Sequence, residues 1–242
     1  DEIVSTEVDE GGDDVLTSGG GVNILVGGFG SDEITGGAGT NTVIGDNALL
    51  DYTTGIGELK TVASLATAIG NDDQITTGDG DDVIVGGVAN DTITAGAGNN
   101  IILGDNGNID FTLDGDFATV DLVETIAPED GGGADVITGS VGNNIIVGGL
   151  GADSITMTGG ENVAIGDNAR VLLYQGALDE ISSTETDLGD IDTIQTGSGN
   201  DIVVGGFADD ALNAGEGNNI AIGDGVIIDY TQGAGTLETV QS

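Results

Sequence analysis

Aspartate recurs at one fixed place in a nine-residue pattern, and its carboxylate is the side chain of this sequence best placed to do chemistry. The pattern is fullest at residues 27–35 and 148–156. There Gly occupies positions one, two and four, Asp position six and an aliphatic residue position eight. Hard divalent cations such as calcium prefer carboxylate and carbonyl oxygens as ligands. Repeated aspartates beside glycine turns therefore predict rows of cation sites, and they imply no catalytic cleft.

The composition narrows the chemistry further. Of the 242 residues, 43 are Asp or Glu and two are basic, Lys60 and Arg170, so the formal net charge is −41. The absence of Cys and His removes thiol chemistry, structural zinc and His-based catalysis. So acidic a chain is a poor partner for nucleic acid, and no apolar run approaches the ~18 residues needed to insert across a membrane. The chain is nevertheless 38% hydrophobic, so it can fold if cations neutralise the acidic groups.

The pattern repeats in four modules, each with four rows followed by an insert that departs from the pattern. All sixteen rows carry Asp or Asn at position six and an aliphatic residue or Ala at position eight. Such self-similarity at a fixed period indicates a repeat architecture. After a tail of a preceding insert at 1–8, the modules span 9–67 (rows 9–44, insert 45–67), 68–129 (rows 68–103, insert 104–129), 130–186 (rows 130–165, insert 166–186) and 187–242 (rows 187–222, insert 223–242).

These rows resemble the RTX (hemolysin-type) family of calcium-binding nonapeptide repeats, GGxGxDxUx with U an aliphatic residue. Residues 27–35 and 148–156 match that pattern in full, whereas 86–94 and 205–213 carry Ala at position four. The regular rows make up more than half of the chain. The resemblance implies an all-β fold, a parallel β-roll or β-solenoid with two rows per coil and multiple calcium ions held between stacked turns.

If two rows make one coil, the residues at position six form two ladders. Strands in such a stack lie ~4.8 Å apart, so like charges repel unless a cation lies between them. We expect calcium throughout the odd ladder, where every member is Asp: Asp14, Asp32, Asp73, Asp91, Asp135, Asp153, Asp192 and Asp210. We expect weaker binding in the even ladder, where Asn–Asn pairs can form amide ladders without metal: Asn23, Asn41, Asp82, Asn100, Asn144, Asn162, Asp201 and Asn219.

The even rows are apolar on the outward face of the strand as well as on the inward face. A strand that is apolar on both faces is normally buried on both. The stripe is too large to stay exposed on a monomer, so either the inserts fold over it or a second copy packs against it. Lateral self-association would use the apolar residues at positions seven and nine: Ile24, Val26, Ile44, Val83, Val85, Ile101, Leu103, Ile145, Val147, Val163, Ile165, Ile202, Val204, Ile220 and Ile222.

Each insert begins with Gly-Asp-Asn or Gly-Asp-Gly and contains two short apolar segments separated by a glycine turn. These segments fit either a wide extra coil or a hairpin lying on the roll, and the sequence does not decide between them. The aspartates of the opening motif would stack over the last turn of each odd ladder. We expect them to close its final calcium site: Asp46, Asp105, Asp167 and Asp224.

The leading interpretation is a non-enzymatic, calcium-stabilised structural solenoid of an extracellular fibre or surface adhesin. We expect it at the cell surface or outside the cell, associating through the apolar face or end to end. An alternative is an RTX spacer or secretion segment of a larger secreted toxin or hydrolase. A lesser alternative is an ice- or glycan-binding face, suggested by a threonine ladder on the odd rows: Thr17, Thr35, Thr76, Thr94, Thr138 and Thr156.

Overall fold

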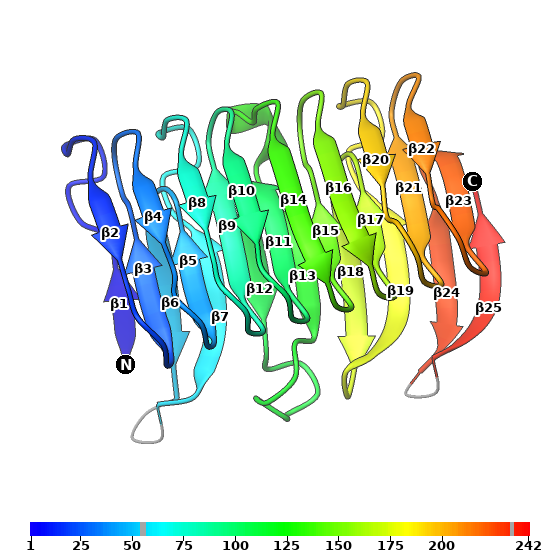
Figure 1. Cartoon of the computed structure of the whole chain (residues 1–242), viewed down its shortest axis with the longest axis horizontal. Helices are drawn as coiled ribbons and strands as arrows, with labels where there is room; N and C mark the ends of the chain where they lie inside the picture. The colour runs from blue at the N-terminus through cyan, green and yellow to red at the C-terminus, as the bar shows by residue number, and fades with distance from the viewer. Residues whose placement is uncertain (54–56, 233–234) are drawn as a thin grey trace.

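The fold consists of three stacked β-sheets that extend along the molecule, with the two chain termini at opposite ends of the stack (Figure 1). The computed structural model describes residues 1–53, 57–232 and 235–242. Within these ranges, the one helical segment is the 3-10 turn Pro128–Asp130. No helix in the described part of the chain is long and apolar enough to cross a membrane. We call the layers the front sheet, the middle sheet and the hairpin sheet.

The front sheet consists of eight parallel strands, each of which contains position eight of an odd row. Its register places each position-eight residue over the next, as in Leu16 over Ile34 and Ile34 over Ile75. The stacking of odd rows on odd rows is therefore confirmed, and it continues across every insert. The strands are β2 (Val15–Thr17), β4 (Glu33–Thr35), β8 (Gln74–Thr76), β10 (Thr92–Ala95), β14 (Val136–Val141), β16 (Ser154–Gly159), β20 (Thr193–Gln195) and β22 (Ala211–Asn213).

The middle sheet is the matching parallel sheet of the even rows. Its inward residues meet those of the front sheet in a thin core, in which Ile34, Ile84 and Ile102 have no exposed surface. Burying one such side chain contributes roughly 1.5–3 kcal/mol. The strands are β3 (Asn23–Val26), β5 (Asn41–Ile44), β9 (Val83–Gly87), β11 (Ile101–Asp105), β15 (Ile145–Val147), β17 (Val163–Ile165), β21 (Ile202–Gly206) and β23 (Ile220–Asp224).

The hairpin sheet is antiparallel and is formed by the inserts together with the first strand of the chain. Each insert is one hairpin, and neighbouring hairpins pair with each other, as β7 does with β12. The strands are β1 (Glu2–Val4), β6 (Ala48–Tyr52), β7 (Leu59–Ser64), β12 (Gly107–Asp110), β13 (Leu122–Thr125), β18 (Ala169–Tyr174), β19 (Ala177–Ser183), β24 (Ile227–Thr231) and β25 (Thr236–Gln241).

The hairpin sheet covers the apolar outer face of the middle sheet. Leu103 and Val147 of the middle sheet and Ile109 and Val123 of the hairpins are fully buried in one cluster. The lateral interface expected on Ile24, Val26, Ile44, Val83, Val85, Ile101, Leu103, Ile145, Val147, Val163, Ile165, Ile202, Val204, Ile220 and Ile222 is therefore wrong for this face. All of these except Ile24 pack in or against that cluster. The chain supplies its own third layer, so a second copy is not needed to bury the stripe.

Candidate calcium sites

One edge of the roll consists of the segments that lead into the strands of the front sheet, either from the middle sheet within a module or from the hairpin sheet at the start of a module. We call it the aspartate edge, because Asp14, Asp32, Asp73, Asp91, Asp135, Asp153, Asp192 and Asp210 lie on it. Glycines shape the turns of the full pattern by adopting backbone conformations that other residues avoid, as Gly28 (φ 105°) and Gly30 (φ 133°) do before Asp32. In two other turns Ala89 (φ 77°) and Ala208 (φ 85°) take such a conformation at position four. A short strand follows at once, so successive aspartates are held in register with the sheet.

The aspartates of this edge are joined in one continuous ladder. The backbone N–H of each Asp donates to Oδ1 of the Asp in the next coil, at 2.7 Å from Asp32 to Asp73 and 2.8 Å from Asp135 to Asp153. The ladder crosses each insert without a break, since Asp91 likewise donates to Asp135 at 2.7 Å. Oδ1 is thus used by the protein, whereas Oδ2 remains for another partner.

That second oxygen is buried and has no hydrogen-bond partner among the described residues in seven of these aspartates: Asp32, Asp73, Asp91, Asp135, Asp153, Asp192 and Asp210. Next to it lies a cradle that only glycine leaves open. A Cβ on Gly27 would collide with Asp32 Oδ2 and with the carbonyl oxygen of Gly45 from the next coil. Buried polar atoms are normally satisfied. An unpartnered carboxylate oxygen beside a carbonyl oxygen fits a hard cation such as calcium.

The electrostatics of the aspartate edge also require positive charge. Burial, together with the neighbouring aspartates, raises the pKa of Asp135 and of Asp153 to about 9. Burial likewise raises the pKa of Asp192 to about 8 and that of Asp73 to about 7. A carboxyl group with such a pKa holds a proton near neutral pH unless a cation replaces it. The same groups that lack a partner are therefore those that gain most from a bound cation.

The opposite edge carries the even ladder, in the turns that lead from the front sheet to the middle sheet. We call it the amide edge, because Asn23, Asn41, Asn100, Asn144, Asn162 and Asn219 lie there with Asp82 and Asp201. The expected hydrogen bonds between paired amides are present. Nδ2 of Asn23 donates to Oδ1 of Asn41, and Nδ2 of Asn144 donates to Oδ1 of Asn162, both at 2.8 Å. Whether metal is absent from these coils stays a prediction.

The aspartates that open the inserts are placed differently from the ladder. Asp46 accepts from the backbone N–H of Val88 at 2.6 Å and of Asn71 at 3.4 Å, one bond to each oxygen. Asp105 and Asp167 are engaged in the same way, whereas Asp224 is exposed. These three buried carboxylates anchor the point where the chain re-enters the roll after a hairpin. Their role as calcium ligands stays a prediction.

The third residue of the insert motif was not singled out from the sequence, although it also has a structural role. Asn106 is buried, and its Nδ2 donates to the carbonyl of Thr67 at 2.9 Å. Asn47 makes the equivalent bond to Val8 at 3.1 Å, which ties the start of one hairpin to the segment leading into the module. The recurrence of Asn after Gly-Asp in three inserts was the available signal.

Comparison with known families settles what these turns are. The model of the RTX calcium-binding nonapeptide repeat matches four times, at residues 17–47, 76–108, 129–164 and 188–221, which together exceed half of the chain. The chain belongs to this family. No curated protein and no solved structure gives a significant match.

Membership of the RTX family makes the chain a calcium-binding structural domain with several ions. Its all-β, parallel roll is the fold expected from the sequence. The aspartate edge supplies what the ions need, namely buried oxygens without partners in register from coil to coil. The assignment of particular residues as calcium ligands stays a prediction from the sequence. The unpartnered carboxylate oxygens of the aspartate edge support it.

Proposed function

We propose that this chain is a calcium-stabilised structural element of an extracellular fibre or surface adhesin. The observation that carries the proposal is the unbroken register of the ladder across all four modules. Asp32 bonds to Asp73, Asp91 to Asp135 and Asp153 to Asp192, so each of the three inserts that lie between modules is bridged. Four modules tied in this way behave as one stiff block, which suits a part that holds other domains apart.

The proposed location follows from calcium supply. Extracellular modules typically bind calcium at about 10⁻⁴–10⁻³ M. A chain that needs such concentrations stays unfolded inside a cell and folds after export. We expect an antibody against the 242-residue chain to label the surface or the filaments of intact producing cells in electron microscopy. Labelling confined to permeabilised cells would rule out the surface role. Label on a freely secreted enzyme would favour the alternative of a spacer or secretion segment.

End-to-end association is the second part of the proposal. The strands β22, β23 and β25 are the last of their sheets, so their outer backbone groups face no further strand of the described chain. In β25 all six residues are exposed, including Val240 at 45%. Edges of this kind pair readily with another strand. Because the front and middle sheets are parallel, a second copy can continue both in the same direction with its own β2 and β3.

We expect calcium-loaded chains to form strings whose length grows with protein concentration in sedimentation velocity. Val240→Lys should shift the distribution toward single chains, because a charge at a strand edge opposes pairing. The matched control is Val136→Lys on the outer face of the front sheet, where Val136 is 47% exposed. Single chains at all concentrations, or strings from Val240→Lys as long as those of the parent, would contradict end-to-end assembly.

The lesser alternative of an ice- or glycan-binding face has less support. Register does place Thr17, Thr35 and Thr76 one above another on the front sheet. The neighbouring exposed column is mixed, with Val15, Glu33 and Gln74 over the same three strands. A regular ligand lattice would need both columns to be uniform, so we favour the structural role.

A further inference from the structure

The loop that joins β12 to β13 in the second insert carries acidic residues that belong to no row of the repeat. Its sequence from 110 to 121 places Asp at positions one, five, seven and twelve and Gly at position six. The calcium loop of EF-hand proteins has oxygen ligands at positions one, three and five, Gly at six and Glu at twelve. Here Thr112 stands at position three, and Asp121 replaces Glu at position twelve. None of the other three inserts contains this spacing.

The two ends of the loop are held together, although strands and not helices flank it. The backbone N–H of Asp121 donates to the carbonyl oxygen of Asp110 at 2.8 Å, so positions one and twelve are neighbours. Gly115 has a φ of 86°, a left-handed conformation that permits a sharp turn at position six. The backbone N–H of Asp114 donates to Oδ2 of Asp121 at 3.2 Å, and the two carboxyl groups interact directly. The fold thus brings positions five and twelve together.

One oxygen of Asp121 is left without a partner in this loop. The residue has no exposed surface, and its Oδ1 accepts no hydrogen bond from the described residues. Burial raises the pKa of Asp121, whereas backbone hydrogen bonds lower the pKa of Asp114. A charged carboxylate therefore lies against a buried carboxyl group. Such a pair needs either a shared proton or a cation between its oxygens.

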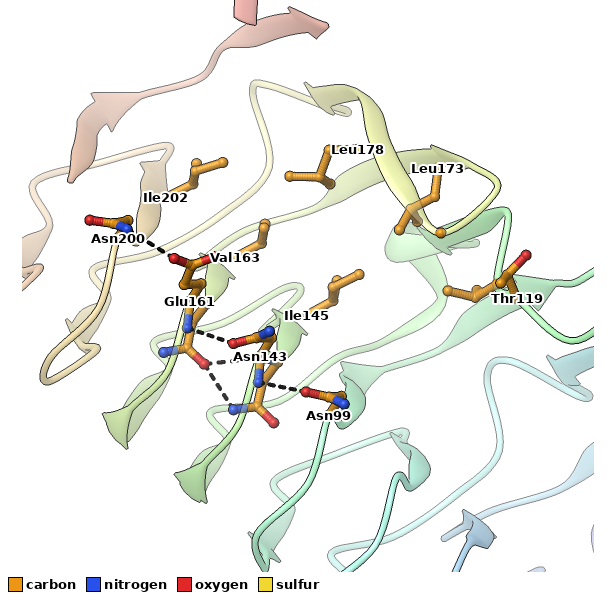
Figure 2. Close-up of a pocket in the computed structure, with 14 residues that line it drawn as sticks. Asn99, Thr119, Asn143, Ile145, Glu161, Val163, Leu173, Leu178, Asn200 and Ile202 are labelled. Atoms are coloured by element: carbon orange, nitrogen blue, oxygen red, sulfur yellow. Dashed lines mark hydrogen bonds between the residues drawn. The ribbon is translucent and has the colours of Figure 1, made fainter. Parts of the chain in front are cut away.

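The neighbouring hairpin fixes the loop from one side. The backbone N–H of Gln175, in the turn between β18 and β19, donates to Oδ2 of Asp114 at 2.7 Å. The backbone N–H of Leu173 donates to the carbonyl oxygen of Asp121 at 2.8 Å. Figure 2 shows Thr119 of the loop next to Leu173 at the end of that hairpin, where both line one pocket. Because a second insert holds the loop at its acidic residues, the two carboxyl groups cannot move apart freely.

We propose that residues 110–121 bind one further calcium ion, with the carboxylates of Asp114 and Asp121 as its charged ligands. Oδ1 of Asp110 accepts from the backbone N–H and the hydroxyl of Thr112, and no three acidic side chains of the described ranges gather at one point. Loop carbonyls and water therefore complete the about six to eight oxygens that calcium takes. The site lies outside the nonapeptide rows, and it is independent of the proposed surface role.

The first test replaces calcium with terbium, a hard cation that takes the same oxygen ligands and emits light when a nearby tyrosine is excited. Tyr174 directly precedes Gln175, whose backbone N–H contacts Asp114, so this tyrosine lies next to the proposed site. We expect a component of the tyrosine-excited emission to disappear in Tyr174→Phe, although that variant binds the parent number of ions. Asp121→Asn should lose the same component with Tyr174 still in place.

The second test counts bound calcium by equilibrium dialysis at about 10 mM, well above the concentrations that extracellular modules need. Asp114→Asn and Asp121→Asn should each bind one ion fewer than the parent, with an unchanged far-UV spectrum. The matched control is the exposed Asp116→Asn in the same loop, because position seven of such loops ligates through its backbone carbonyl. Asp114 is only half-buried, so its variant decides the matter even if Asp121→Asn does not fold. Parent emission and a parent count in Asp114→Asn would show that the two carboxyl groups share a proton, and would overturn the proposal.

Discussion

Removal of calcium with a chelator at about pH 7.5 is expected to unfold the whole chain. The cause is the aspartate edge, where seven buried carboxylates with unpartnered oxygens follow one another along the stack. Without calcium, carboxylates that stay charged ~4.8 Å apart repel by roughly 3 kcal/mol per pair at an effective dielectric constant of about 20. Those with a raised pKa, about 9 for Asp153 and about 8 for Asp192, instead take up a proton that the unfolded chain does not bind at this pH. Summed over the seven carboxyls, these costs are expected to exceed the ~5–15 kcal/mol net stability of a folded domain.

The measurement is far-UV circular dichroism during a calcium titration, with small-angle scattering at each end point. The unfolded chain should reach a radius of gyration of roughly 50 Å. We expect a single cooperative unfolding transition, because one continuous ladder of hydrogen-bonded aspartates runs through all four modules. A chain that keeps its β spectrum after complete chelation at this pH would show that the carboxylates are neutralised by something other than calcium.

Acid should partly replace calcium. The pKa of each of these carboxyls is higher in the fold than the usual value of 3.8, about 7 for Asp73 and about 9 for Asp153. Between the usual pKa of 3.8 and the raised pKa of the fold, these carboxyls bind more protons in the folded chain than in the unfolded chain. The stability of the calcium-free fold therefore falls as pH rises through that range. The chelated chain should therefore regain β structure on acidification toward about pH 4. The same linkage makes calcium binding release protons near neutral pH.

Replacement of Ile109 by Asp is expected to prevent folding even at about 10 mM calcium, well above the concentrations that extracellular modules need. Ile109 lies in β12 with no exposed surface, between Val62 of β7 and Val123 of β13. An unpaired carboxylate in that layer loses its hydration without gaining a partner, at a cost of several kcal/mol. The loss of the buried side chain adds roughly 2–5 kcal/mol, and together these exhaust the stability of an ordinary domain.

The matched control for Ile109→Asp is Val136→Asp, which puts the same charge on a strand of the front sheet. Val136 is 47% exposed on the outer face, so this variant should fold at the same calcium concentration with a melting temperature close to that of the parent. Ile109→Ala should fold but melt earlier. Equal tolerance of Asp at both positions in thermal melts would mean that the hairpins do not cover the middle sheet in solution.

The sequence sufficed for the parts of the fold that depend on local repetition. A glycine turn, an Asp and a buried aliphatic residue at fixed spacing allow few backbone paths, and stacking such paths on themselves produces the front and middle sheets. The pairing of Leu16 with Ile34 and of Leu25 with Val43 follows from that periodicity. The alternation of an all-Asp ladder with an Asn-rich ladder could be read in the same way.

The same reasoning could not predict the fold of the inserts, because their strands pair with strands of inserts that are distant in the chain. The segments 48–52 and 59–64 are short and apolar, and either a wide coil or a hairpin would bury them. Only the assembled structure shows β7 pairing with β12 of the next module, so that a continuous third sheet covers the middle sheet. The expectation of a second copy on that face failed for the same reason.

The sequence by itself determined that this protein is an acidic, calcium-binding repeat. The reason is that Asp recurs at a fixed nine-residue spacing, and stacked coils bring residues at the same position of the repeat together. Only the tertiary structure decided which buried oxygens lack a hydrogen-bond partner among the described residues. The sequence predicts Asp46 as a further calcium ligand, which stays a prediction, and the fold adds that its two oxygens accept hydrogen bonds from the backbone of Asn71 and Val88. Thr77 looks like one more polar residue of a turn, yet the fold buries its hydroxyl without a hydrogen-bond partner among the described residues. Hydrogen bonds between neighbouring coils use some oxygens and spare others, and those contacts exist only after the coils have stacked.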